Sequence, residues 1–156
     1  MSDRIFTMTN LGRIKIDPQV WERMKPHIQL LPEAKEAGGV LLGRFIKDSK
    51  DIVIDKITIP MIGDKRTRFS FIRGEAMHQR IVDREWSRSK GTCNYLGEWH
   101  THPENYPSPS NTDIADWKRK LKEGHYSSRY LYFIIVGIKE LYIWEGDRRT
   151  LKLKKL

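Results

Sequence analysis

The stretch GEWHTHPENYPSPSNTDIADW (residues 97–117) decides how the middle of the chain folds. Two histidines, one residue apart, stand where a strand-like segment meets Pro103. A proline-rich loop follows, and Ser110 and Asp113 then open a segment with helical spacing. The stretch therefore predicts a strand, a loop and a helix, with polar side chains on both sides of the loop.

The histidine pair is suited to holding a metal ion. On a strand, residues i and i+2 point to the same face, about 6.5–7 Å apart. His100 and His102 can therefore converge on one ion, each with a nitrogen about 2.0–2.1 Å from zinc. Such a pair also arises by chance, so it does not establish a site alone. His27, His78 and His125 stand in no such arrangement, and we expect them at the surface or at helix ends.

Ser110 and Asp113 have the spacing of a helix capping box, with serine at the N-cap and an acidic residue three positions later. A carboxylate in the first turn of a helix can also reach a metal held by the preceding strand. The two roles do not conflict. Two imidazoles and one carboxylate leave the fourth position of a tetrahedral zinc site open, which is the catalytic pattern.

Hydrolysis at such a site needs a residue that carries a proton, and two glutamates are candidates. Glu98 lies two residues before His100 and so shares its face of the strand. Glu36 precedes an apolar, glycine-rich segment at 37–46. The spacing of the residues does not choose between the two glutamates.

The rest of the chain alternates between strand and helix patterns. We expect strands at 12–16, 37–46, 51–59, 94–102, 129–138 and 140–146, with a final one near 150–153. We expect helices at 19–31, 72–89 and 110–123. The first opens after Asp17-Pro18 and is bent or divided at Pro26, and the apolar face of the second consists of Ile72, Met77, Ile81, Val82 and Trp86. This order indicates an α/β or α+β fold in layers, with a mainly antiparallel sheet.

Composition indicates one cytoplasmic domain. The chain has 156 residues, of which 38% are hydrophobic and 31% charged, and it contains no apolar run of the roughly 18 residues that a membrane span needs. Its N-terminus lacks the pattern of a secretory signal. Cys93 is the single cysteine, which excludes an intrachain disulfide, and we expect it to be a buried thiol.

The net charge of +9 is concentrated in the last quarter of the chain. Residues 118–156 carry 11 Lys or Arg against 4 Asp or Glu, whereas residues 1–117 carry 18 against 16. Such a segment forms a solvated basic face, or it attracts polyanions and acidic proteins.

Taken together, the polar positions resemble the JAB/MPN-plus family of JAMM metalloproteases, which are best known as deubiquitinating isopeptidases. The matching motifs are Glu36-x-x-Gly39-x-Leu41-x-Gly43, His100-Thr101-His102-Pro103 and Ser110-x-x-Asp113, with seven residues (103–109) between His102 and Ser110. The resemblance covers about residues 12–146. It implies a JAB/MPN fold, with a curved, mixed, mainly antiparallel sheet flanked by helices, in a single domain spanning residues 1–156.

The resemblance also implies a role for each polar position. One zinc ion per chain would be held by His100, His102 and Asp113, with Glu36 as general base and acid. Ser110 would donate a hydrogen bond to the developing oxyanion. Catalytically inactive relatives have lost these positions, so their presence here favours an active enzyme.

The motif GEWHTHP resembles a compact bacterial branch of this family found in anti-phage operons, because many eukaryotic members carry a large apolar residue in place of Glu98. In that branch the peptidase accompanies a cyclic-dinucleotide synthase and an E1/E2-like conjugating enzyme, and it releases the synthase's conjugated C-terminus. Glu98 would then lie behind the ligands or face the substrate. The chain is too short for long ubiquitin-gripping insertions, so we expect a flexible or ubiquitin-like C-terminal tail as substrate.

Such a tail would add as a strand beside an exposed sheet edge. The loop 104–110 either forms one wall of the substrate groove or merely connects the strand to the helix. Two other functions within the family are alternatives, a non-catalytic MPN scaffold and a nucleic-acid-associated JAB protein. A zinc nucleobase deaminase is excluded, because it needs a Pro-Cys-x-x-Cys motif and the chain has one cysteine.

Overall fold

The computed structural model describes residues 4–124 and 128–156. Eight strands form one mixed sheet in the order β1-β2-β4-β3-β7-β8-β9-β10, and β5 and β6 form a separate hairpin. Neighbouring strands of the large sheet run antiparallel except for the pairs β2–β4 and β7–β8. The strands are β1 (Arg4–Thr7), β2 (Arg13–Ile16), β3 (Gly38–Phe45), β4 (Ile52–Ile57), β5 (Lys65–Thr67), β6 (Ser70–Ile72), β7 (Asn94–Thr101), β8 (Tyr130–Val136), β9 (Leu141–Asp147) and β10 (Leu153–Lys155). The helices are α1 (Pro18–Met24), α2 (Glu75–Arg88) and α3 (Asn111–Glu123), with a 3₁₀ turn at Lys25–His27.

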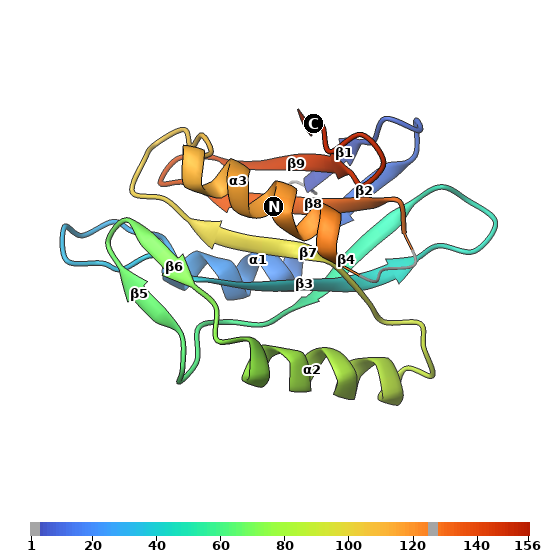
Figure 1. Ribbon diagram of the computed structural model, residues 1–156, viewed down its shortest axis with the longest axis horizontal. Helices are drawn as coiled ribbons and strands as arrows, with labels where there is room; N and C mark the ends of the chain where they lie inside the picture. The colour runs from blue at the N-terminus through green and yellow to red at the C-terminus, as the bar shows by residue number, and fades with distance from the viewer. Residues whose placement is uncertain (1–3, 125–127) are drawn as a thin grey trace.

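The predicted fold class, a curved and mainly antiparallel sheet flanked by helices, is confirmed (Figure 1). The sheet curls far enough for Met8, which follows β1, to meet Tyr132 of β8, whose hydroxyl lies 2.9 Å from the methionine sulfur. Glu145 of β9 holds the same corner, because it accepts hydrogen bonds from Tyr132 and Thr9.

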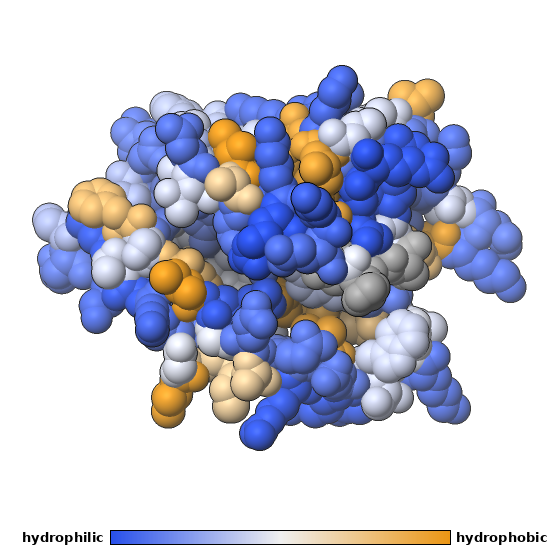
Figure 2. All heavy atoms as spheres, viewed as in Figure 1, coloured by the Kyte–Doolittle hydropathy of each residue, from blue (hydrophilic) through white to orange (hydrophobic). Residues whose placement is uncertain are grey.

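Helices cover both faces of the sheet, and each face has its own apolar core. On the α1 face, residues of β2, β3, β4, β7 and β8 form the larger core with Val20 and Met24 of α1. On the other face, Trp117 and Leu121 of α3 pack on β8 and β9, while α2 lies beside β3 and β7. Figure 1 shows α3 in front of the sheet and α1 behind it. Figure 2 shows that the face carrying α3 is mostly hydrophilic, with small separate hydrophobic patches.

Strand β7 lies between β3 and β8 and passes between the areas that α2 and α3 cover. Its pairing with β3 skips Leu96, so β7 carries a β-bulge before Gly97. Leu96 and Trp99 belong to the α1-side core. Glu98 and His100 instead line a pocket between the hairpin strand β6 and α3. The central strand therefore presents its polar side chains in the gap that the two helices leave.

The predicted strands of the large sheet are present, and the last one, β10, lies slightly later than expected. The first helix ends at Met24, and the chain continues as a 3₁₀ turn around Pro26, so the prediction of a helix to residue 31 is wrong. Strand β1 and the β5–β6 hairpin were not predicted from the sequence. Their strands have three or four residues and no fully buried side chain, so they carry little hydrophobic pattern.

The predicted apolar face of α2 is partly wrong. Ile81 and Val82 pack against the buried Val40 and Leu42, but Met77 and Trp86 are 43% and 52% exposed. The buried residues of α2 are His78 and Glu85. Cys93 is buried in the same small cluster, as expected, and burial raises the pKa of its thiol.

The expectation that His78 lies at the surface or a helix end is wrong. Its ring is fully buried, with Nδ1 2.6 Å from Thr58 Oγ1 and Nε2 3.0 Å from Asp64 Oδ1. These bonds satisfy both ring nitrogens and join α2 to the segment after β4. His125 lies outside the described residues.

In the described part of the chain, the longest helix is α2 with 14 residues, and no helix is long and apolar enough to cross a membrane.

Replacement of Gly97 by alanine is expected to destabilise the protein by at least about 2 kcal/mol, because Gly97 has a positive φ and its α-carbon faces the backbone of β8. Its φ is 147°, and a Cβ there would lie 1.7 Å from Tyr132 O. Urea denaturation of Gly97→Ala checks this, with Gly63→Ala as control, since Gly63 has a positive φ but nothing within 4 Å of its Cβ position. Equal losses in the two variants would contradict the packing argument.

Candidate active site

Polar side chains converge where β7 ends. The Nε2 atoms of His100 and His102 lie 3.1 Å apart, and their ring centroids are 4.8 Å apart. Thr101 between them points to the opposite side, where its hydroxyl is buried and bonded to Gln29. The alternation of the strand therefore places both imidazoles on one face, as their spacing predicts.

Asp113 faces the same point from the first turn of α3. Its Oδ2 atom lies 3.3 Å from His100 Nε2 and 3.1 Å from His102 Nε2. The capping box is present as well, since Ser110 Oγ accepts a bond from the Asp113 N–H at 3.0 Å and Asp113 Oδ2 accepts one from the Ser110 N–H at 2.9 Å. Asp113 thus takes part both in the helix cap and in the cluster with the histidines.

Burial alone would raise the pKa of Asp113, but hydrogen bonds with His100 and His102 outweigh it and hold that pKa far below its usual range. Asp113 is therefore a carboxylate at neutral pH. An anionic oxygen between two imidazoles is a donor set that zinc and other transition metals accept.

The distances among the three donor atoms fit one shared ion. Ligands about 2.0–2.1 Å from a tetrahedral zinc lie roughly 3.3–3.4 Å from one another. The three observed separations are 3.1, 3.1 and 3.3 Å. His100, His102 and Asp113 are thus close to the arrangement that one metal ion requires.

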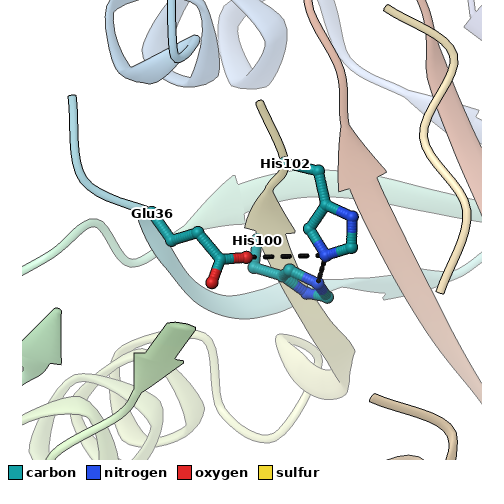
Figure 3. A group of neighbouring side chains, drawn as sticks. All are labelled: Glu36, His100 and His102. Atoms are coloured by element: carbon teal, nitrogen blue, oxygen red, sulfur yellow. Dashed lines mark hydrogen bonds and ion pairs between the residues drawn. The ribbon is translucent and has the colours of Figure 1, made fainter. Parts of the chain in front are cut away.

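Glu36 lies on the other side of His102. Its side chain is 3% exposed, and Oε1 is 3.5 Å from His102 Nε2. Figure 3 shows the carboxylate pointing toward the two imidazoles from the segment before β3. Burial raises the pKa of Glu36 to about 7, although the charge of His102 works against that rise. Its carboxyl group is therefore able to take up and release a proton near neutral pH.

Two sets of three residues could hold a metal here. Glu36, His100 and His102 offer ligand atoms that all lie within 4.8 Å of one another. Asp113 offers an oxygen within 3.3 Å of both imidazole nitrogens. The closer contacts and the lowered pKa favour Asp113 as the third ligand, and the raised pKa of Glu36 suits a proton carrier.

Glu104, which was not predicted from the sequence, lies next to the histidines. Its Oε1 atom is 2.7 Å from His102 Nδ1. Such a carboxylate accepts a hydrogen bond from Nδ1–H and would leave Nε2 as the ring nitrogen available to a metal ion. The available signal was an acidic residue two positions after the second histidine.

Glu98, the other candidate for the proton carrier, is bound to two cations. Its Oε1 atom is 2.7 Å from Arg73 Nη2, and Oε2 forms an ion pair with Lys120 of α3. Lys120 also pairs with Asp116 at 2.6 Å. Glu98 therefore lines the pocket as part of a charge network that links β7 to α3. The negative charge of its carboxylate is balanced by Arg73 and Lys120.

The pocket beside the site lies between β6 and α3. Its lining includes Glu36, His100, Ser110 and Asp113 together with residues 69–73 of the hairpin and residues 116, 117 and 120 of α3. Of the loop 104–110, the lining contains Ser110 alone. That loop packs on the β8–β9 turn, where Glu104 O accepts from the Ile138 N–H at 2.7 Å. The hairpin therefore forms one wall of this pocket, while the residues of the loop before Ser110 are absent from its lining.

Comparisons with known proteins show which family the chain resembles. Residues 19–150 match the family of prokaryotic homologs of the JAB domain. A CD-NTase/cGAS isopeptidase of Pseudomonas aeruginosa (strain BWHPSA011 / Pa011) is 39% identical over 122 residues, which are 78% of this chain and 75% of that protein. A CD-NTase/cGAS isopeptidase of Escherichia coli (strain TW11681) is 33% identical over 156 residues, 100% of this chain and 95% of that one.

The solution structure of a protein from Desulfitobacterium hafniense resembles this one with a TM-score of 0.62 and 21% identity, over 92% of this chain and 89% of that chain. At this identity the likeness supports the fold alone.

Asp113→Ala is expected to lose metal, because it removes the oxygen that contacts both imidazoles. Zinc measured by mass spectrometry after dialysis should fall from near one per chain to a small fraction of that. A loss of about 1 kcal/mol in unfolding free energy should accompany it, since the capping box is broken. Asp116→Ala, one turn later on the same helix, is the control and should keep its metal. Full metal content in Asp113→Ala would remove this residue from the ligands.

Proposed function

We propose that this chain, which belongs to the family of prokaryotic homologs of the JAB domain, is a zinc-dependent isopeptidase or peptidase of bacterial anti-phage defence. It hydrolyses the bond that follows the C-terminal tail of a conjugated cyclic-nucleotide synthase or of a ubiquitin-like modifier. Relatives named CD-NTase/cGAS isopeptidases support this assignment. The observation that carries it is the convergence of two imidazoles and an ionised carboxylate beside a buried glutamic acid.

His100, His102 and Asp113 hold one zinc ion per chain in this proposal. When bound, zinc supplies a Lewis acid that polarises a carbonyl oxygen and lowers the pKa of water toward 7. Glu104, which contacts His102 Nδ1, would fix the orientation of the His102 ring and so keep Nε2 available to a metal ion. Asp113 supplies a negative charge that offsets part of the charge of the cation.

Glu36 moves the proton. Its carboxylate takes a proton from the attacking water while a carbon–oxygen bond forms at the scissile carbonyl. It then gives that proton to the leaving nitrogen as the carbon–nitrogen bond breaks, which yields a carboxylic acid and an amine. A pKa of about 7 lets Glu36 perform both steps at neutral pH. Glu98 is a poorer candidate, since it pairs with Arg73 and Lys120.

Ser110 stabilises the charge that develops on the carbonyl oxygen. The capping bond from the Asp113 N–H uses a lone pair of Ser110 Oγ and leaves the hydroxyl hydrogen available as a donor. Removal of one such donor typically costs about a hundred- to a thousandfold in rate.

The substrate tail lies in the pocket between β6 and α3. Among the described residues, strand β6 pairs with β5 alone, so its other edge can accept an extended peptide as an added strand. An E1/E2-like conjugating enzyme would act in the same pathway by making the conjugate that this enzyme cleaves. Residues 1–156 would act as one domain.

Glu36→Gln is expected to abolish cleavage, with a fall of at least about a thousandfold in kcat, while zinc stays near one per chain. A fusion or isopeptide conjugate with a glycine- or alanine-ended tail serves as substrate. Glu98→Gln makes the same change in a second buried glutamate of the pocket and should reduce kcat less. The reverse order of the two effects would make Glu98 the proton carrier, and loss of zinc in Glu36→Gln would make Glu36 a ligand.

Ser110→Ala should lower kcat by about a hundredfold or more with little change in KM, because the lost hydrogen bond acts on the transition state. The lost cap should also cost about 1 kcal/mol of unfolding free energy. Ser110→Thr keeps both the hydroxyl and the cap and should retain most of the activity. An unchanged rate in Ser110→Ala would leave this residue as a helix cap only.

A further inference from the structure

Gln29 is a buried amide whose hydrogen bonds reach three segments around the site. It is 1% exposed. Its Nε2 donates to Ala34 O at 3.1 Å and to Arg68 O at 2.9 Å, and its Oε1 accepts from Thr101 Oγ1 at 2.8 Å. Ala34 leads into Glu36, Arg68 lies in the turn of the β5–β6 hairpin, and Thr101 stands between the two histidines. The NH₂ group and the oxygen of the Gln29 amide are thus hydrogen-bonded to segments that carry the site residues or lie beside them.

Thr101 continues this network into the strand that bears the histidines. Its hydroxyl accepts from the Ala37 N–H at 2.9 Å while it donates to Gln29. Its own N–H donates to Ala37 O at 2.9 Å. Both the N–H and the C=O of Ala37, the residue directly after Glu36, are therefore hydrogen-bonded to Thr101.

The hairpin holds Glu36 from the opposite direction. The Glu36 N–H donates to Thr67 O at 2.8 Å, and Arg66 Nε donates to Glu36 O at 2.7 Å. Residues 34–37 form neither helix nor strand. The position of Glu36 therefore depends on these bonds to β7 and the hairpin.

We propose that Gln29 and Thr101 are positioning residues that set the Glu36 carboxylate relative to His100 and His102. This inference rests on the proposed function, because it takes Glu36 as the proton carrier. Neither residue faces the metal ligands, so their role is exerted through the main chain of residues 34–37. The side-chain amide of Gln29 also binds the turn of the hairpin. Gln29 therefore connects the wall of the substrate pocket to the segment that carries the proton carrier.

The position of Glu36 matters because proton transfer requires contact at hydrogen-bond distance. A shift of about 1 Å in a reacting group can cost a hundredfold in rate. The three proposed zinc ligands lie on β7, just after it and on α3, outside residues 34–37. Loosening that segment should therefore lower turnover without releasing metal.

Thr101→Val tests this most directly, since it keeps the shape of the side chain and removes its hydroxyl. We expect kcat to fall about ten- to a hundredfold, with KM within twofold and zinc near one per chain. Thr101→Ser restores the hydroxyl and should recover most of the rate. Gln29→Met should also lower kcat, with the same metal content.

A second readout needs neither metal nor substrate. In the metal-free protein, NMR-detected hydrogen exchange of the Ala37 amide should become at least tenfold faster in Thr101→Val than in wild type. Ile143→Val on β9, two strands from β7, is the control for a general loss of stability. It should leave both the Ala37 exchange and kcat near their wild-type values.

Three results would overturn the proposal. An unchanged kcat in Thr101→Val, in an assay where wild type cleaves, would refute the positioning role and leave the proposed function intact. A fall in kcat that Ile143→Val shares would mean that the network serves stability alone. Absence of cleavage by zinc-loaded wild type would refute the proposed function, and the positioning role would fall with it.

Discussion

The central position of β7 is the constraint on which the site depends. Pairing with β3 on one side and β8 on the other fixes the strand, and its alternation then directs His100 and His102 to one face and Thr101 to the other. The α1-side face is filled by a continuous apolar core. On the opposite face, α2 and α3 pack apart from each other, so the polar side chains of β7 border a pocket. A one-residue change of register would put both histidines into the core.

Two carboxyl groups near one pair of imidazoles have opposite electrostatic environments. Asp113 makes hydrogen bonds with both rings and with the Ser110 backbone, so its pKa is lowered. Glu36 is buried against one ring, and its pKa rises to about 7. Because of this difference, Asp113 stays an anion that can bind a cation, whereas Glu36 can exchange protons at neutral pH. Arg73 and Lys120 balance the negative charge of Glu98, a further carboxylate of the pocket.

The parts of the site that follow local rules could be predicted from the sequence. The alternation of a strand explains His100 and His102, and the capping box explains why Asp113 lies at the start of α3. Glu36 could not be placed by spacing, because an irregular segment carries it to β7 through hydrogen bonds with Thr101 and the hairpin. Glu36 was chosen over Glu98 only because the motifs of the chain resemble those of a known family.

The fold class could be predicted because the long strands are buried and their hydrophobic pattern is strong. The β5–β6 hairpin could not, since its short exposed strands are held by the main chain of the segment before β3. The buried polar residues of α2 were missed for a related reason, because His78 is buried through bonds to Thr58 and Asp64. Periodicity detects apolar burial and does not detect burial of this kind.

We propose that one metal ion, held by the cluster at the end of β7, makes this protein an isopeptidase. The most direct test is cleavage of a lysine-linked conjugate by the purified protein before and after removal of its metal with a chelator, and again after zinc is added back. The account predicts that cleavage is lost with the metal and returns at one zinc per chain. Undiminished cleavage by the stripped protein, or restored zinc without cleavage, would contradict it.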